Sequence, residues 1–445
     1  MAESICTTLP NGLLVFLKEI HTAPIISQWV WYRVGSRDEI PGQTGISHWV
    51  EHMQFKGTPD FPAGMLDREI SRLGGFWNAF TFLDWTTYFE TLPAEAIDVA
   101  LRLEADRMRH SLFDAQEVES ERTVIIAERQ GSENEPLFLL GEEVQAAAFR
   151  VHSYHHEVIG DLADLHSMQR DDLYQHYRTY YTPGNAVLAL AGDFDGGAML
   201  KRLEQLYADI PAGPAVARRN RPEPPQKGER RVSVEGPGET TYIEIAYHAP
   251  AATHPDFFPL MAADSLLNGP GNLNMFSEGI SNKTSRMYRA LIEGELAVST
   301  SGGMQATLDP YLHSTTIIPR PERSVEEVVA AFDAEIERLQ ETPPTPEELR
   351  RAVKQERALF SYGSERITNQ AFWLGFAEMI DPGGRWFDQF LERMAAVTPE
   401  EVQRAAQIYL QPRNRVLGVY LPDGTAADEE HDAAFDDAAA DEAEE

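Results

Sequence analysis

The sequence predicts an α+β fold of two similar domains that arose by internal duplication. The main observation is that residues 171–193 (DDLYQHYRTYYTPGNAVLALAGD) and 400–422 (EEVQRAAQIYLQPRNRVLGVYLP) align without a gap. Each copy reads as an acidic helix start, a helix, a Pro/Asn turn and an apolar strand. The two copies lie about half a chain apart, which indicates a duplication rather than chance similarity between two such units.

A linker between the two copies is the second observation. Residues 211–231 (PAGPAVARRNRPEPPQKGERR) are rich in proline and basic residues and lack apolar periodicity. We therefore expect a first domain at 1–212, a linker at 213–229 and a degenerate second domain of the same fold at 230–423. The remaining residues, 424–445, consist mainly of Ala, Asp and Glu, and we expect a disordered acidic tail.

Strands and long helices alternate within both halves. The short, interrupted apolar run at the N-terminus predicts a strand rather than a signal peptide. Residues Ile25–Arg33 predict a strand and Glu95–His110 a helix. Two further strands, at Val232–Val234 and Tyr242–Tyr247, open the second half. This mixture of elements is the third observation behind the α+β prediction.

Composition limits the classes of protein that this chain can represent. With 445 residues, 42% of them hydrophobic and 24% charged, it is expected to be globular with two or three domains. No run approaches the roughly 18 apolar residues of a membrane span. A formal charge of −33 argues against binding to nucleic acid or to anionic membranes. The acidity favours basic peptides as partners or serves solubility alone, and these two interpretations remain open.

The lone cysteine, Cys6, cannot form an internal disulfide. This suits a reducing compartment. We therefore expect a cytoplasmic protein.

The strongest local signal is His48-Trp49-Val50-Glu51-His52. We expect a helix that Thr44 caps and that Gly57 helps to end. One face of this helix is apolar, formed by Ile46, Trp49, Val50 and Met53. On the other face, two histidines at i and i+4 can aim their imidazoles at one metal ion. Glu51 lies between them, where it could hold a metal-bound water and take its proton. The alternative is a solvated helix face.

A second segment, residues 114–131, supplies carboxylates. It predicts a helix with Asp114 at its start, on which Glu121 and Glu128 share one face seven residues apart. Apolar neighbours on or beside this face suggest that it is buried, and a buried charge needs a partner. A zinc ion held by two histidines and Glu128 would provide one, with Glu121 orienting ligand or water. The alternative is an ordinary salt-bridged or exposed helix.

These segments resemble one known family. The stretch VWYRVGSRDEIPGQTGISHWVEHMQFKGTP resembles the lead-in and inverted zinc motif of the pitrilysin/insulinase family, which includes the mitochondrial processing peptidases. GGFWNAFTFLDWTTYFETLP is similar to its substrate-facing strand, and ESERTVIIAE to the helix of its third zinc ligand. The resemblance covers roughly residues 7–423, and its specific motifs lie in the first half. It implies that each domain is a mostly antiparallel sheet packed with helices.

The resemblance also implies roles for individual residues and a Zn²⁺ cofactor. His48, His52 and Glu128 would be the zinc ligands. Glu51 would be the general base and Glu121 an assisting carboxylate, both of them catalytic. Asn78 and Ala79 would lie on an edge strand that pairs with an extended peptide substrate by strand addition.

The second half departs from the family pattern. Active members have an Arg, followed about seven residues later by a Tyr, which bind substrate and the developing oxyanion. Here Arg289 could match the Arg as a substrate-binding residue, whereas the Tyr position falls on Val298, or on Leu296 by strict count. The positions that correspond to the zinc motif are Ser277, Ile280 and Ser281.

The leading hypothesis is therefore a zinc endopeptidase for unfolded or short peptides. It would be the zinc-bearing subunit of a heterodimer whose homologous partner supplies the Arg–Tyr pair; a homodimer is the alternative assembly. A second hypothesis is a non-catalytic scaffold or assembly subunit of the same family. A third is a different metal hydrolase, such as an amidase, that uses the same ligands.

Overall fold

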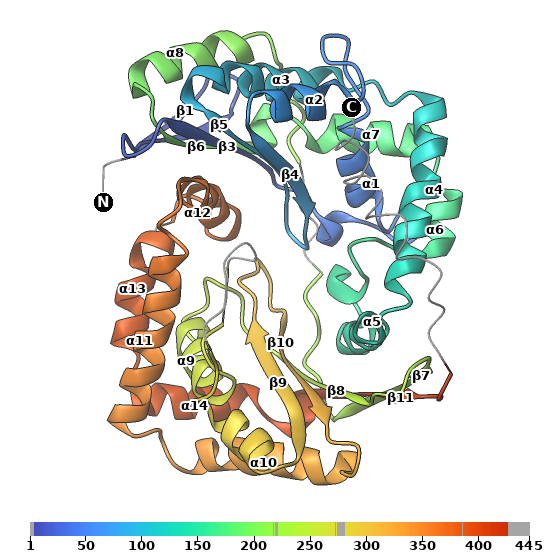
Figure 1. Cartoon of the computed structure of the whole chain (residues 1–445), viewed down its shortest axis with the longest axis vertical. Coiled ribbons are helices and arrows are strands. Elements are labelled where there is room, and N and C mark those ends of the chain that lie inside the picture. The colour runs from blue at the N-terminus through green and yellow to red at the C-terminus, as the bar shows by residue number, and fades with distance from the viewer. Residues whose placement is uncertain are drawn as a thin grey trace, which may run out of the picture.

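The computed structural model describes residues 4–425, except for residues 217, 219, 220, 272, 274–280 and 385. Two sheets form its centre (Figure 1). The first sheet has the order β1-β2-β6-β3-β5-β4 and contains β1 (Ile5–Thr8), β2 (Leu14–Glu19), β3 (Ile25–Tyr32), β4 (Phe76–Thr81), β5 (Thr86–Pro93) and β6 (Ala186–Gly192). The second has the order β7-β11-β8-β10-β9 and contains β7 (Arg230–Gly236), β8 (Tyr242–His248), β9 (Ala297–Met304), β10 (Leu312–Pro319) and β11 (Arg415–Pro422).

Helices from both halves of the chain cover these sheets. The first half contributes α1 (Ile46–Met53), α2 (Met65–Arg72), α3 (Ile97–His110), α4 (Ala115–Ser132), α5 (Pro136–Ala148), α6 (Leu162–Ser167), α7 (Arg170–Tyr180) and α8 (Gly196–Tyr207). The second half contributes α9 (Phe257–Leu267), α10 (Val325–Glu341), α11 (Pro346–Tyr362), α12 (Ile367–Ile380), α13 (Trp386–Ala396) and α14 (Pro399–Tyr409).

The two halves repeat one topology, which confirms the predicted fold class. Each sheet has one parallel pair, β2 with β6 and β7 with β11, while the other neighbours run antiparallel. The repeated turn is also matched at atomic level. Asn185 Nδ2 donates to the carbonyl of Tyr180 at 2.9 Å, and Asn414 Nδ2 donates to that of Tyr409 at 2.8 Å. The duplicated asparagine therefore fixes the same helix-to-strand turn twice.

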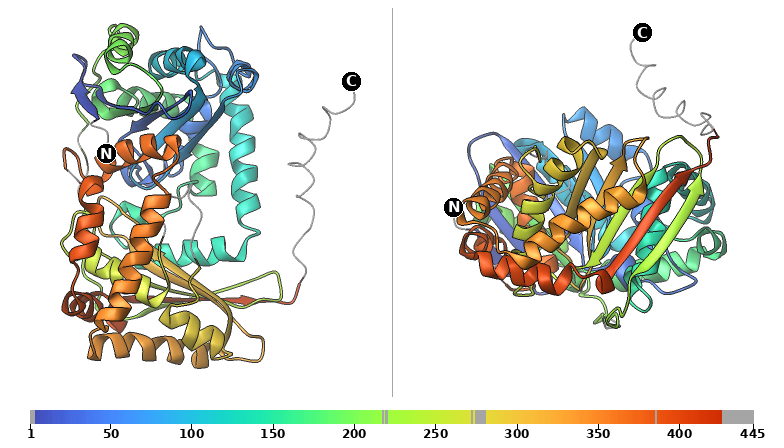
Figure 2. Two further views of the ribbon diagram at one scale, coloured as in Figure 1. Left: turned by 60° about the vertical axis from the view of Figure 1, so that its left-hand side comes forward. Right: turned by 90° about the horizontal axis from the view of Figure 1, so that it is seen from below.

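Each half also lends one helix to the other half's sheet. Helix α12 packs on β3, β6 and β2 of the first sheet, whereas α5 packs on β11, β7 and β8 of the second (Figures 1 and 2). The boundaries at 212 and 230 stay predictions, because this exchange ties the two halves together. Part of the predicted linker (217, 219 and 220) and most of the predicted tail (426–445) lie outside the described residues.

Aromatic rings form the contact between α12 and the first sheet. The Trp29 ring stacks on Phe89 at a centroid distance of 4.0 Å. Phe372 of α12 meets Trp29 and Trp31 edge-on, at 5.3 Å each. All four side chains are at most 3% exposed. This contact therefore buries large apolar side chains between the halves.

Replacing Phe372 with alanine is expected to lower the free energy of unfolding by about 3–5 kcal/mol, because the substitution leaves a cavity against two tryptophans. Chemical denaturation followed by tryptophan fluorescence measures the change. Tyr362→Ala, at a side chain that is 64% exposed, is the control and should change stability little. Equal effects of the two substitutions would contradict the structural role given to α12.

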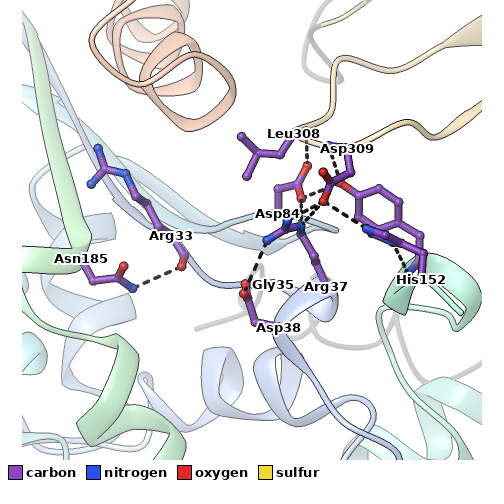
Figure 3. A network of polar contacts seen from close by, with 10 residues as sticks. Arg33, Gly35, Arg37, Asp38, Asp84, His152, Asn185, Leu308 and Asp309 are labelled. Atoms are coloured by element: carbon purple, nitrogen blue, oxygen red, sulfur yellow. Dashed lines mark hydrogen bonds and ion pairs between the residues drawn. The ribbon is translucent and has the colours of Figure 1, made fainter. Parts of the chain in front are cut away.

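A polar network also joins the halves beside the β4–β5 turn (Figure 3). Arg37 Nε donates to Asp309 Oδ2 at 2.8 Å, and His152 Nε2 lies 3.1 Å from the same oxygen. Hydrogen bonds from His152 and Arg37 lower the pKa of Asp309 to about 2, although burial acts against this. The buried carboxylate of Asp84 accepts from the Leu308 N–H at 2.9 Å. The turn that follows β4 is therefore held by the second half.

A buried carboxyl group in the second half makes stability depend on pH. Glu356 of α11 is 1% exposed and accepts a hydrogen bond from the Gly271 N–H at 2.9 Å. Burial, reinforced by the nearby charge of Asp264, raises the pKa of Glu356 to about 8. Between the ordinary carboxyl pKa and about 8, the folded state therefore holds a proton that the unfolded state has released. The free energy of unfolding falls as pH rises through this window.

Glu356→Gln should remove this contribution while keeping an acceptor for the Gly271 N–H. The variant is expected to gain stability over the wild type as pH rises from about 5 to 8, by up to about 1.4 kcal/mol per pH unit. Denaturation midpoints of both proteins across this range test the prediction. Parallel curves would show that Glu356 titrates at its ordinary pKa.

Candidate metal centre

Helix α1 is fixed by its apolar face and by an unexpected cap. Its four apolar side chains, Ile46, Trp49, Val50 and Met53, are at most 2% exposed. The helix begins after Gly45, whose φ of +84° suits glycine, and a Cβ there would lie 2.3 Å from the Ile159 carbonyl oxygen. The Glu39 carboxylate, rather than Thr44, accepts from the N–H groups of Gly45 and Ser47, at 2.8 and 2.9 Å. The opposite face of α1, which carries His48 and His52, therefore faces α4.

The structure brings the two histidines of α1 and one carboxylate of α4 to a common point. His48 Nε2 lies 3.7 Å from Glu128 Oε1, and His52 Nε2 lies 3.7 Å from Glu128 Oε2. The three donor atoms all lie within 4.8 Å of one another. Among the described residues, no other group of three or more His, Cys, Asp or Glu side chains meets in this way.

This donor set fits a zinc ion. Tetrahedral ligands at about 2.0–2.1 Å from zinc lie about 3.3–3.4 Å apart, so donor atoms that lie within 4.8 Å of one another would have to approach by at most about 1.5 Å. Burial, with the nearby His52 ring, lowers the pKa of His48 to about 3. The neutral imidazole that results is the form that donates to a metal. Two nitrogens and one carboxylate are also the ligands of known catalytic zinc sites, which keep a further position open.

Glu121 holds one of these imidazoles in the required orientation. Its Oε1 lies 2.8 Å from His52 Nδ1. Since an ionised carboxylate only accepts, Nδ1 carries the proton and Nε2 is left to face Glu128. Lys56 Nζ lies 2.5 Å from the other oxygen of Glu121. Despite burial, these two hydrogen bonds lower the pKa of Glu121.

Glu51 sits beside the donor set as a nearly buried carboxyl group. It is 8% exposed, and Thr81 Oγ1 of β4 donates a hydrogen bond to its Oε2 at 2.6 Å. Burial raises the pKa of Glu51 to about 7, although the hydrogen bond from Thr81 acts in the opposite direction. A carboxyl group with this pKa can both take and return a proton near neutral pH.

The two carboxylates of α4 differ in exposure. Glu121 is buried as expected, whereas the Glu128 side chain is 46% exposed and Val124 is 48% exposed. The seven-residue spacing predicts that the two side chains share one face of the helix. It does not predict how much of that face neighbouring elements cover. The Glu128 end of the site therefore opens to solvent, where a ligand can enter.

Asn78 and Ala79 lie on β4, the last strand of the first sheet, whose outer edge has no neighbouring strand among the described residues. Asn78 Oδ1 accepts from the Ala79 N–H at 2.8 Å. Ala79 is 6% exposed and faces the same side as Thr81, two residues further on. The two residues thus lie at a free sheet edge, on the same strand as Thr81, which contacts Glu51.

The structure does not bring Arg289 together with the histidines of this chain. Arg289 lines a pocket of about 370 Å³ with Arg286, Arg338 and Glu348. That pocket adjoins α10, at the far end of the molecule from α1 (Figure 1). Val298 lies on β9 and is 62% exposed. Of the positions that correspond to the zinc motif, 277 and 280 lie outside the described residues, and Ser281 is exposed.

Sequence reasoning missed two residues that contact the site, Thr81 and Lys56. Thr81 follows Asn78 by three positions in a strand, and only the packing of β4 on α1 brings its hydroxyl to Glu51. Lys56 lies four residues after His52, one helical turn on, which is a spacing that could have suggested a contact on the same side.

Among the described residues, no helix is both long enough and apolar enough to cross a bilayer.

Comparison with protein families gives two adjoining matches. Residues 14–162 match the model "Insulinase (Peptidase family M16)", and residues 167–356 match "Peptidase M16 inactive domain".

Individual relatives match over most of the chain. The mitochondrial-processing peptidase subunit beta of Lentinula edodes is 26% identical over 93% of this chain and 89% of its own length. The uncharacterized zinc protease YmxG of Bacillus subtilis is 25% identical over 94% of this chain and 98% of its own. A crystal structure of a protease from Helicobacter pylori superposes with a TM-score of 0.87 at 25% identity, covering 95% of this chain and all of the other.

Proposed function

Because this chain belongs to the pitrilysin/insulinase family of peptidases (peptidase family M16), we propose that it is a zinc-dependent endopeptidase for unfolded or short peptides. The observation that carries the proposal is the meeting of His48, His52 and Glu128 at one point. The similar proteins named above also support the proposal, because one is called a processing peptidase and another a zinc protease.

In the proposed mechanism, His48, His52 and Glu128 would hold a zinc ion, which would supply a Lewis acid for the scissile carbonyl and a lower pKa for water. Glu51 takes the proton of the attacking water and passes it to the leaving amine. Its environment supports this role, because burial raises its pKa to about 7. Glu121 keeps the His52 ring in place through Nδ1.

The substrate would be held as an extended strand on β4. Main-chain hydrogen bonds along a free edge give affinity without demanding particular side chains, which suits unfolded peptides. Asn78 and Ala79 lie on this edge. The charge of −33 would favour basic peptides among them. A cytoplasmic location is part of the same proposal.

We further propose that a homologous partner subunit completes the site. The motivation is that the position corresponding to the tyrosine of active members is Val298, or Leu296 by strict count, and that Arg289 lines a pocket beside α10. Losing an oxyanion donor costs about 10²–10³ in turnover. Co-purification from the source cell, followed by peptidase assays with and without the co-purified protein, tests this. Full activity of the chain alone as a homodimer would refute the heterodimer.

A scaffold role is the second candidate, and Val298 is the observation that favours it. Metal analysis of the purified protein separates the two functions. About one zinc per chain, with chelator-sensitive cleavage of an unfolded peptide, supports the peptidase. A metal-free protein that assembles with its partner and cleaves nothing after addition of zinc supports the scaffold.

A further inference from the structure

We propose that Thr81 is a positioning residue that orients Glu51 and links peptide binding on β4 to that orientation. This inference rests on the proposed peptidase function. The hydrogen bonds of the Thr81 side chain go to Glu51 and Thr86 and not to the three metal-binding side chains.

Thr81 holds the Glu51 carboxylate through a hydrogen bond. Its hydroxyl, at 2.6 Å from Oε2, is the one hydrogen-bond partner of this carboxylate among the described residues. Oε1 has no hydrogen-bond partner in the part of the chain that the structure describes. One oxygen is thus anchored while the other is free to face a water molecule, and this is the arrangement that a general base requires.

The Glu51 carboxylate sets the direction of this hydrogen bond, although a second acceptor lies on the neighbouring strand. Thr86 lies opposite Thr81 in the β4–β5 register, with the two Oγ1 atoms 3.4 Å apart. Thr86 Oγ1 donates its own proton to the Val34 carbonyl at 2.9 Å. The proton of Thr81 goes to Glu51 rather than to Thr86, because the ionised carboxylate only accepts and lies nearer, at 2.6 Å rather than 3.4 Å. As a β-branched residue in a strand, Thr81 also has few side-chain rotamers, so its hydroxyl is already placed.

The position of Thr81 on β4 links the two parts of the site. Ala79 and Thr81 face α1 from the same side of the strand, while the outer edge of β4 is free to pair with an extended peptide. Pairing orders the backbone of an edge strand. A bound peptide would therefore also order the donor that holds Glu51, so that the base is best aligned when substrate is present.

Steady-state kinetics of the Thr81→Val variant test the proposal. The measurement uses the full chain, together with a partner subunit if cleavage requires one. Valine keeps the shape and removes the hydroxyl. We expect kcat to fall about 10–100-fold, as is typical for lost support of a site residue, with KM and bound zinc unchanged. Thr81→Ser, which keeps the hydroxyl, should stay within about threefold of the wild type. Thr87→Val is the matched control, because the Thr87 hydroxyl donates to the Val30 carbonyl instead.

A binding measurement separates positioning from substrate affinity. In a Glu51→Gln background, fluorescence anisotropy should give the same peptide Kd with and without Thr81→Val. An unchanged kcat in Thr81→Val, a tenfold weaker peptide Kd, or a Thr81→Ser as slow as Thr81→Val overturns the inference alone. Wild-type protein that lacks zinc-dependent cleavage overturns the proposed function, and this inference with it.

Discussion

Glu51→Gln is expected to reduce kcat by about 10²–10⁴-fold while leaving zinc bound. The glutamine amide keeps the size of the side chain and can still accept the hydrogen bond from Thr81, but it cannot take a proton. Since Glu51 belongs to none of the contacts between His48, His52 and Glu128, the metal ligands stay in place. Peptide cleavage assays and zinc determination on the same preparation measure both quantities.

Glu69→Gln, the same substitution on α2 at the protein surface, is the control for this experiment and should retain full activity. Turnover of Glu51→Gln at the wild-type rate would refute Glu51 as the general base. Loss of zinc together with activity would instead place Glu51 in metal binding.

His48→Ala is expected to weaken zinc binding by roughly 10²–10³-fold and to abolish activity at micromolar zinc. Structural zinc sites with four protein ligands are worth about 10–16 kcal/mol in total, so a single ligand contributes about 2.5–4 kcal/mol. Competition with a chromophoric chelator gives the affinity. Glu128→Ala should behave in the same way if the carboxylate of α4 is the third ligand.

Two surface substitutions control for general effects of these changes. His21→Ala removes a histidine that is 59% exposed, and Glu117→Gln alters the first turn of α4. Both should bind zinc like the wild type. If His48→Ala also kept one zinc at wild-type affinity, the metal would be held elsewhere in the chain.

Local patterns predicted much of this molecule. The repeat at 171–193 and 400–422 gave the duplicated fold, because a helix, a turn and a strand are each encoded by nearby residues. Likewise, the spacing of His48, Glu51 and His52 follows from the helical repeat alone. The helix predicted at residues 114–131 corresponds closely to α4, which spans Ala115–Ser132.

Features that depend on distant contacts could not be read in this way. The cap of α1 comes from Glu39, since Thr44 is used instead to bond Asp164. The exposure of Glu128 depends on how far neighbouring layers reach, and the contact of Thr81 with Glu51 depends on how β4 packs on α1. The exchange of α5 and α12 leaves no local trace either, because the apolar residues of a helix indicate that it is buried but not which sheet it packs on.

Because α12 follows the first sheet in the sequence, this exchange delays the packing of that sheet during synthesis. The first sheet is complete in sequence at Gly192, but its cover, α12, ends only at Ile380. At about 5–20 residues per second, the ribosome needs roughly 10–40 s to make the intervening chain. For that time α12 cannot cover the Trp29–Trp31 face of the nascent sheet, which exposes apolar surface of the kind that chaperones shield.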